Sequence, residues 1–315
     1  MIFFKLSKTT FPVQFAVTII GNILTLFVLL SANMRNRANH LLAALALADI
    51  AVFIFMLPTS LSAFQIFYES SKFRIIFANA KPHFAAFANW FSCAAIWFAL
   101  YPKCYPILFK NFSLNIIIII NVVVESFIIT SVILLVTFIL TSYHHFSYRC
   151  ATLWVCNMTQ VYVKCLSITW NWTAFGLVPY EQPSDTFVSY INTSAIANAL
   201  IGVIIPVFIV AFLNVSLIRL LRIRTQQAGA EESFGPSAST NFHDQERKMT
   251  VTVAAIVSCF TISQLPSAIL FLYEKLVSDA KTETFAKVSC ITNFLVITGK
   301  MLNVVLFCLT SVTFR

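Results

Sequence analysis

Three charged side chains, Asp49, Glu125 and Lys300, lie inside long apolar runs of this 315-residue sequence. If those runs cross a membrane, a charge near the bilayer centre costs about 2.5–3.5 kcal/mol on insertion scales, so each residue needs a partner or a function. Asp49 and Lys300 lie at similar depths, ~15 Å and ~16–20 Å of helix from the predicted inner face. We therefore expect them to form an interhelical ion pair. The alternative is that Lys300 extends to water or pairs elsewhere while Asp49 is neutral.

The polar residues around this pair predict a network and not a catalytic centre. Asn22 and Asn303 can hydrogen-bond across helices, so we expect them to join Asp49 and Lys300 in one intramembrane network. Glu125 has no evident partner, and a protonated carboxyl bonded to a neighbouring helix is its expected state. No catalytic or metal-binding spacing accompanies the eight Cys, so we expect no enzyme, metal or cofactor.

A small transporter or channel is an alternative function for these charges. Asp49, Glu125 and Lys300 would then form a charge relay through the membrane. Many secondary transporters are built from duplicated halves with discontinuous helices. The sequence shows no internal repeat, which counts against this alternative.

The composition indicates a multi-pass membrane protein. Hydrophobic residues make up 59% of the chain and charged residues 10%, whereas soluble domains carry about 25% charged residues. The net charge of +9 does not indicate nucleic acid, because the densest basic run is the spaced set Arg219, Arg222 and Arg224. Basic loops beside apolar spans act instead as orientation signals. The first apolar run lacks a small-residue cleavage site, so it is expected to insert as a helix.

The apolar runs predict an all-α fold, a seven-transmembrane helix bundle that forms a single domain over residues 1–315. About 20 apolar residues span a bilayer as a helix. The third run is the shortest and ends at Pro102. A polar stretch at about 225–246, rich in Gly, Ser and Gln, predicts a flexible third inner loop. The seven predicted spans are Phe11–Leu30, Leu41–Phe64, His83–Tyr101, Leu114–Thr141, Ala195–Leu221, Thr250–Tyr273 and Phe285–Leu309.

The loop between the fourth and fifth spans favours an extracellular amino terminus. Its sequons at Asn157, Asn171 and Asn192 predict glycosylation, which requires a lumenal loop. The opposite orientation exposes only Asn111. The basic residues are close to evenly divided, with a higher density on the predicted inner side. The same loop contains Cys150, Cys156 and Cys165, of which an oxidising compartment would allow two to pair, with the choice left open.

Several motifs, in order and at matching depths, resemble rhodopsin-like G-protein-coupled receptors over almost the whole chain. The motif around Gln264 is similar to that of nematode and insect receptors for FMRFamide-like neuropeptides, because Gln264 stands where most of the family has Trp. The segments that carry the resemblance are Gly21-Asn22, Leu45-Ala-Leu-Ala-Asp49, Pro206, Phe260-Thr-Ile-Ser-Gln-Leu-Pro266 and Asn303-Val-Val-Leu-Phe307.

The resemblance implies a plasma-membrane receptor that transmits binding of an extracellular peptide to a heterotrimeric G protein. The outer half of the third span has no acidic residue, so the counter-ion that an amine ligand needs is missing. Ile297 stands where opsins carry the retinal lysine. In the family the helix-two Asp binds sodium, and here Lys300 would replace that ion. The usual pocket level gives the ligand-binding candidates Asn89, Trp90, Gln264, Tyr273, Asn293 and Phe294.

The sequence also departs from the family pattern where the third helix should meet the G protein. The expected acidic-Arg-aromatic triplet is absent between Trp97 and Tyr105, and Lys81 stands near the level of the usual helix-three Cys. Asn214 and Phe307 replace two family tyrosines. These departures indicate either a degenerate receptor or an incomplete chain, and they predict little G-protein activation.

Overall fold

The structure is a computed structural model of the whole chain. It describes residues 8–31, 37–109, 122–157, 160–168, 183–213, 215–216, 219, 258–259, 261–274 and 282–310. The predicted flexible loop at about 225–246, Asn171 and Asn214 lie outside these ranges.

The chain folds mainly into long helices, and a β-hairpin connects two of them. The π-helical segment η4 continues α7, and residues 205–213 extend the same rod as α-helix. A further helix occupies residues 261–274. The elements with defined bounds are α2 (Phe11–Leu29), α3 (Arg37–Leu61), α4 (Gln65–Tyr68), α5 (Ser71–Phe109), α6 (Val122–Thr141), η2 (Ser142–His145), β1 (Tyr148–Val155), β2 (Gln160–Ser167), α7 (Asp185–Ala197), η4 (Asn198–Ile204) and α10 (Glu283–Thr310).

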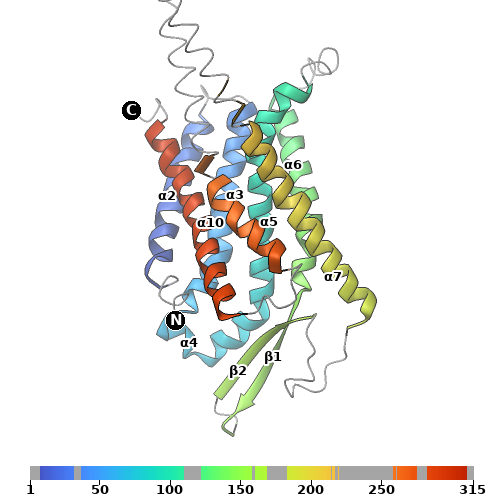
Figure 1. Cartoon of the computed structure of the whole chain (residues 1–315). Coiled ribbons are helices and arrows are strands. Elements are labelled where there is room, and N and C mark those ends of the chain that lie inside the picture. The colour runs from blue at the N-terminus through green and yellow to red at the C-terminus, as the bar shows by residue number, and fades with distance from the viewer. Residues whose placement is uncertain are drawn as a thin grey trace, which may run out of the picture.

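The long helices run side by side as a bundle (Figure 1). Six helices in the described residues are long and apolar enough to span a membrane. The helix at 261–274 covers the outer part of the predicted sixth span, whose first residues lie outside the described ranges. The seven-helix membrane fold predicted from the sequence is therefore confirmed. The amino-terminal end of α2 lies at the hairpin end of the bundle, and α10 ends at the opposite end (Figure 1).

The third helix differs from its prediction. We expected His83–Tyr101, but α5 runs from Ser71 to Phe109 without stopping at Pro102. The Ser70 hydroxyl accepts a hydrogen bond from the Phe73 amide and so caps the first turn. The prediction was too short because it counted apolar residues only, whereas the first turns of α5 carry basic residues and project beyond the apolar span.

The hairpin is an exception to the predicted all-α fold. β1 and β2 pair antiparallel from Tyr148–Ser167 to Val155–Gln160. The hairpin rests on the outer extension of α5, where Arg74 Nη1 donates to the Val161 carbonyl at 2.9 Å. Its strands could not be recognised from apolar spans, because a solvent-facing hairpin needs no long apolar run.

Apolar side chains form both the core of the bundle and its lipid-facing surface. Leu41, Leu45 and Ala48 of α3 pack against α5 residues Ala94, Ala95 and Phe98. Large side chains on the outside remain exposed, because lipid is as apolar as the helix interior. Among those on the long helices are Phe27 at 74%, Ile262 at 73%, Phe127 at 72% and Phe212 at 71%.

Candidate functional site

The predicted ion pair joins α3 to α10. Lys300 Nζ donates a hydrogen bond to Asp49 Oδ1 at 2.6 Å, and the two side chains are 0% and 2% exposed. Lys300 therefore does not extend to water, which excludes that alternative in this structure. The two residues are 251 positions apart in the chain, so only the packing of α3 against α10 brings the charges together.

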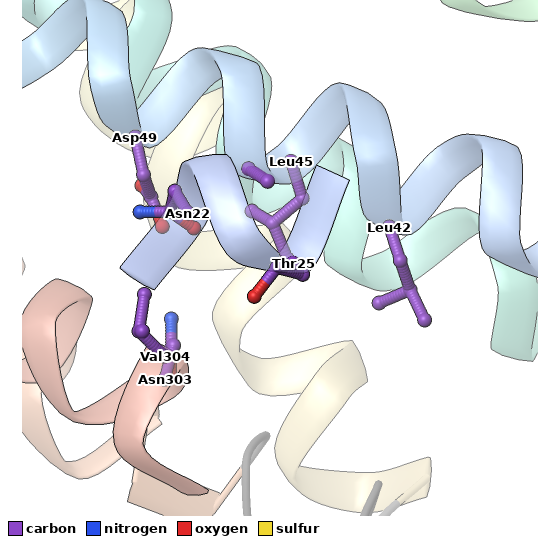
Figure 2. A pocket seen from close by; sticks show the side chains of 8 residues that line it. Asn22, Thr25, Leu42, Leu45, Asp49, Asn303 and Val304 are labelled. Carbon is purple, nitrogen blue, oxygen red and sulfur yellow. The ribbon is translucent and has the colours of Figure 1, made fainter. Parts of the chain in front are cut away.

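A small cavity of about 30 Å³ lies directly beside the Asp49 carboxylate. Figure 2 shows Asn22 and Thr25 of α2, Asp49 of α3 and Asn303 of α10 converging on it. Its volume matches that of one water molecule. The lining residues are Asn22, Thr25, Leu42, Leu45, Ala46, Asp49, Asn303 and Val304.

The two asparagines of the predicted network line this cavity and carry unsatisfied amide groups. Asn22 Nδ2 and both side-chain polar atoms of Asn303 are buried without a hydrogen-bond partner in the protein. A buried amide without a partner costs roughly 1–3 kcal/mol. Because these atoms are themselves inaccessible, they are an unfavourable part of the helix interior and not a polar surface of the cavity. The ammonium of Lys300 already supplies the positive charge beside Asp49.

The sequence analysis missed a polar stripe along α2 that leads to this network. Gln14 Nε2 donates to Thr298 Oγ1 of α10 at 2.9 Å. Thr18, Asn22 and Thr25 follow on the same buried face. The spacing of four, four and three residues is that of one helix face. The signal in the sequence is this helical spacing of polar residues within an apolar run.

Glu125 lies near the start of the described part of α6 and is partly buried. The predicted span begins at Leu114, which lies outside the described residues, so the depth of Glu125 in the membrane, its expected protonated state and the alternative relay through it stay predictions.

The six ligand-binding candidates lie in different environments. Trp90 Nε1 donates to the Leu134 carbonyl at 2.9 Å, which commits its ring to the contact of α5 with α6. Asn89 is exposed. Gln264 is buried, and its Nε2 has no partner in the protein. Asn293 accepts a long hydrogen bond from Ser267 at 3.4 Å.

Of the remaining two candidates, Tyr273 lies on the helix at 261–274 and Phe294 lies on α10. Tyr273 is 50% exposed and stacks on Phe285 with ring centroids 6.3 Å apart. Phe294 is half-buried. The structure thus groups Gln264, Tyr273 and the α10 residues on one side of the bundle, whereas Trp90 faces α6.

Comparisons with known proteins decide the family. A profile of the family described as serpentine type 7TM GPCR chemoreceptor Srw matches residues 9–315. A Caenorhabditis elegans protein, F59B2.13, which is provisionally named as a G-protein coupled receptor, is 37% identical over 311 residues, 98% of this chain and 71% of that protein. The chain belongs to the Srw family. The Srw assignment establishes a serpentine receptor. It corrects the predicted resemblance to rhodopsin-like receptors for FMRFamide-like neuropeptides. It favours neither an enzyme nor a transporter.

The outer loop of this Srw receptor carries one disulfide. Cys150 and Cys165 face each other across the hairpin and are bonded. Cys156 lies outside this bond, at the exposed end of β1. At the base of the hairpin, desolvation of its hydroxyl raises the pKa of Tyr148, although half of the residue is exposed, and the carboxylate of Glu274 raises it further.

Two of the three predicted glycosylation sites lie in described parts of the receptor. Asn157 occupies the hairpin turn with a positive φ of 54°, a conformation that Asn tolerates well. Asn192 is exposed within α7. The turn presents its side chain to solvent in an irregular backbone, so Asn157 is the better acceptor.

The inner end of the Srw receptor retains the departure noted in the sequence. α5 continues to Phe109, and its sequence contains no arginine after Arg74. The helix is therefore longer than predicted, but its added turns do not contain the expected acidic-Arg-aromatic triplet.

Proposed function

We propose that this Srw-family chain is a plasma-membrane receptor for an extracellular peptide, which it binds at the hairpin end of the bundle. The observation that carries this proposal is the disulfide-closed hairpin that stands on the outer extension of α5. The hairpin contacts α5 near its turn, where Arg74 bonds to Val161, and it exposes apolar side chains such as Trp154, the cross-strand partner of Val161, which is a suitable surface for a partner.

An extended peptide suits this surface because strands can pair with an unpaired sheet edge. The sheet has two strands in the described part of the chain, and the outer edge of β2 meets α5 where Arg74 donates to the Val161 carbonyl, so β1 offers the edge for an added strand. Trp154 is 50% and Tyr162 is 51% exposed, and both provide anchoring surface.

The charge pattern supports a peptide over a small amine. α5 contains no Asp or Glu from Ser71 to Phe109, so an amine would find no carboxylate on this helix. A peptide can instead be held by backbone hydrogen bonds and apolar contacts. Gln264, Tyr273, Asn293 and Phe294 lie on the neighbouring helices and would contact the deeper part of the ligand.

Ligand binding is transmitted through the packing of α2, α3 and α10. The Asp49–Lys300 pair fixes α3 to α10 at the level of the small cavity. A ligand that favours another arrangement of these helices at the outer end shifts the equilibrium at the inner end, where a heterotrimeric G protein binds.

Binding is tested with a set of fluorescent short peptides on membranes that contain the full chain. We expect saturable binding that is lost in the double variant Trp154→Ala with Tyr162→Ala. Phe212→Ala, which removes an even more exposed aromatic ring from the lipid-facing side, should bind normally. Competition by amines but not by peptides would overturn the proposal.

Signalling is measured separately as ligand-dependent nucleotide exchange with reconstituted G protein. Because α5 lacks the arginine that meets the G protein in related receptors, we expect exchange close to the basal rate even at saturating peptide. Robust exchange would show that another inner residue performs this role, and it would leave the binding proposal intact.

A further inference from the structure

Two histidines from different elements face each other at the hairpin end of the bundle. His83 lies on α5 and His145 ends η2, 62 positions later in the chain. Their Nδ1 atoms are 3.0 Å apart. The ring centroids are 5.2 Å apart and the planes are tilted by 32°, so the rings meet through their nitrogens and not as a stacked pair.

The surrounding side chains hold this pair in place while leaving it accessible. The ring of Phe87 meets His145 edge-on with centroids 5.0 Å apart, and Phe146 meets it at 6.5 Å. His83 is exposed and His145 is half-buried, so an ion from solution can reach the nitrogens. Both rings are attached to helical segments, which limits their movement.

We propose that His83 and His145 form a binding site for a divalent transition-metal ion. Neutral imidazole is the commonest protein ligand for such ions. Each ring would bind the metal through Nδ1 and keep its single proton on Nε2. Water molecules would complete the coordination, because no third His, Cys, Asp or Glu joins the pair in the described part of the chain.

The separation of the nitrogens favours particular metals. With metal–nitrogen bonds of about 2.0–2.1 Å, nitrogens 3.0 Å apart subtend an angle of about 91–97° at the metal. Square-planar and octahedral ions have adjacent ligands at about 90°, which suits Ni²⁺ and Cu²⁺. Tetrahedral Zn²⁺ would need the nitrogens about 3.3 Å apart and is expected to bind more weakly.

Metal binding here would join two parts of the outer surface. The ion would bridge α5 to the segment that leads into β1, so it would hold the base of the hairpin against the helix that supports it. A ligand that binds only the folded receptor raises its thermal stability, and the gain grows with the logarithm of the ligand concentration above its dissociation constant. The site therefore predicts a stabilising effect of Ni²⁺ that does not depend on a peptide.

The test uses the full chain, purified in detergent without a polyhistidine tag. Equilibrium dialysis with Ni²⁺ should give one bound ion per chain, and the unfolding temperature should rise by several degrees. His83→Asn and His145→Asn should each remove both effects. His144→Ala is the matched control, because His144 lies in the same short helix but stacks on Tyr143. It should bind Ni²⁺ normally.

Cu²⁺ gives a direct view of the ligands in a Cys156→Ser background, which removes an exposed thiol that could react with the ion. Electron paramagnetic resonance should show coupling to two equatorial imidazole nitrogens. Ni²⁺ binding that persists in the variant with both histidines replaced, or a wild-type chain that binds no Ni²⁺ in dialysis, would overturn the proposal. Because dialysis measures occupancy, either result stands even if a variant is less stable.

Discussion

At the residue scale, the buried charges stabilise the bundle only while both are present. Asp49 and Lys300 are almost completely shielded from solvent, so each depends on the other to offset its desolvation. Asn22 and Asn303 lie close by with unsatisfied amides, which makes this the most polar part of the helix interior that the structure describes. Removing one charge therefore destabilises the bundle more by leaving the other charge without a partner than by changing the packing.

Lys300→Met and Asp49→Asn are each expected to lower stability by about 3–5 kcal/mol, because each strands a buried charge. The double variant should recover much of that loss. Thermal unfolding in detergent, combined in a double-mutant cycle, measures the coupling. Lys287→Met is the control, since its pair with Glu283 is exposed and contributes about 0–1 kcal/mol. Additive effects of the two single changes would show that the pair does not stabilise the fold.

If Lys300 replaces a sodium ion, sodium should leave ligand affinity unchanged. The ammonium already lies 2.6 Å from the carboxylate, so a second cation at the same oxygen would be repelled. Titration of bound peptide with NaCl, against an equal concentration of choline chloride, measures this. Sodium-specific weakening of binding in a chain with Asp49 and Lys300 intact would contradict the replacement.

At the element scale, close helix contacts depend on residues without side chains. A Cβ added at Gly21 of α2 would overlap Val304 Cγ1 of α10, next to the cavity and the ion pair. Likewise, a Cβ at Gly299 would overlap the Ser263 side chain on the helix at 261–274. These glycines let α10 approach both neighbours, and the approach in turn brings Lys300 within reach of Asp49.

Gly21→Ala should destabilise the chain by about 1–3 kcal/mol, because the added methyl group overpacks the contact of α2 with α10. Val304→Ala removes the overlapping methyl and should restore most of the loss when combined with Gly21→Ala. Unfolding temperatures of the two single variants and the double variant measure this. A double variant no more stable than Gly21→Ala would place the cause outside this contact.

The hairpin is the element that joins the outer surface to α5. The Cys150–Cys165 bond links its strands at a sequence separation of 15, and a loop of that size is stabilised by about 3 kcal/mol in the chain-entropy view. Arg74 holds the same hairpin from the side of α5. Loss of the disulfide should therefore loosen the hairpin while the apolar bundle remains folded.

Cys150→Ser with Cys165→Ser is expected to reduce peptide binding at least tenfold and to leave the helical circular dichroism signal unchanged. Cys156→Ser is the control, because Cys156 lies outside the bond. Hydrogen exchange over residues 148–167 should rise only in the double variant. Unchanged binding would show that the ligand does not use the hairpin.

At the scale of the whole molecule, the orientation of the bundle decides which end meets ligand. The amino-terminal end of α2 and the hairpin share one end of the bundle, and α10 finishes at the other (Figure 1). An extracellular hairpin therefore requires an extracellular amino terminus. The predicted sequons at Asn157 and Asn192 lie toward the same end, on the hairpin turn and in the first turns of α7.

Glycosidase treatment of the chain expressed in animal cells should increase its mobility on a gel. Asn157→Gln should remove most of that shift, because Asn157 lies in an exposed turn, whereas Asn192→Gln should remove less. No shift, together with cleavage of the hairpin by protease on the cytosolic side, would reverse the orientation.

The sequence by itself determined the membrane fold and the chemistry of the buried pair. Long apolar runs cannot be covered by polar surface, so they specify spanning helices, and the similar depths of Asp49 and Lys300 follow from counting residues along those helices. The ends of α5 could not be read in this way. Hydrogen bonds such as the Ser70 cap and the support of the hairpin, and not apolar length, decide where that helix begins.

Only the tertiary structure decided which side chains meet. It paired Cys150 with Cys165, because strand register and not spacing alone places two cysteines opposite each other. It also brought His83 to His145, residues that carried no motif. Such contacts depend on the rotation of each helix about its axis, which packing against several neighbours sets at once and which no local pattern in the sequence specifies.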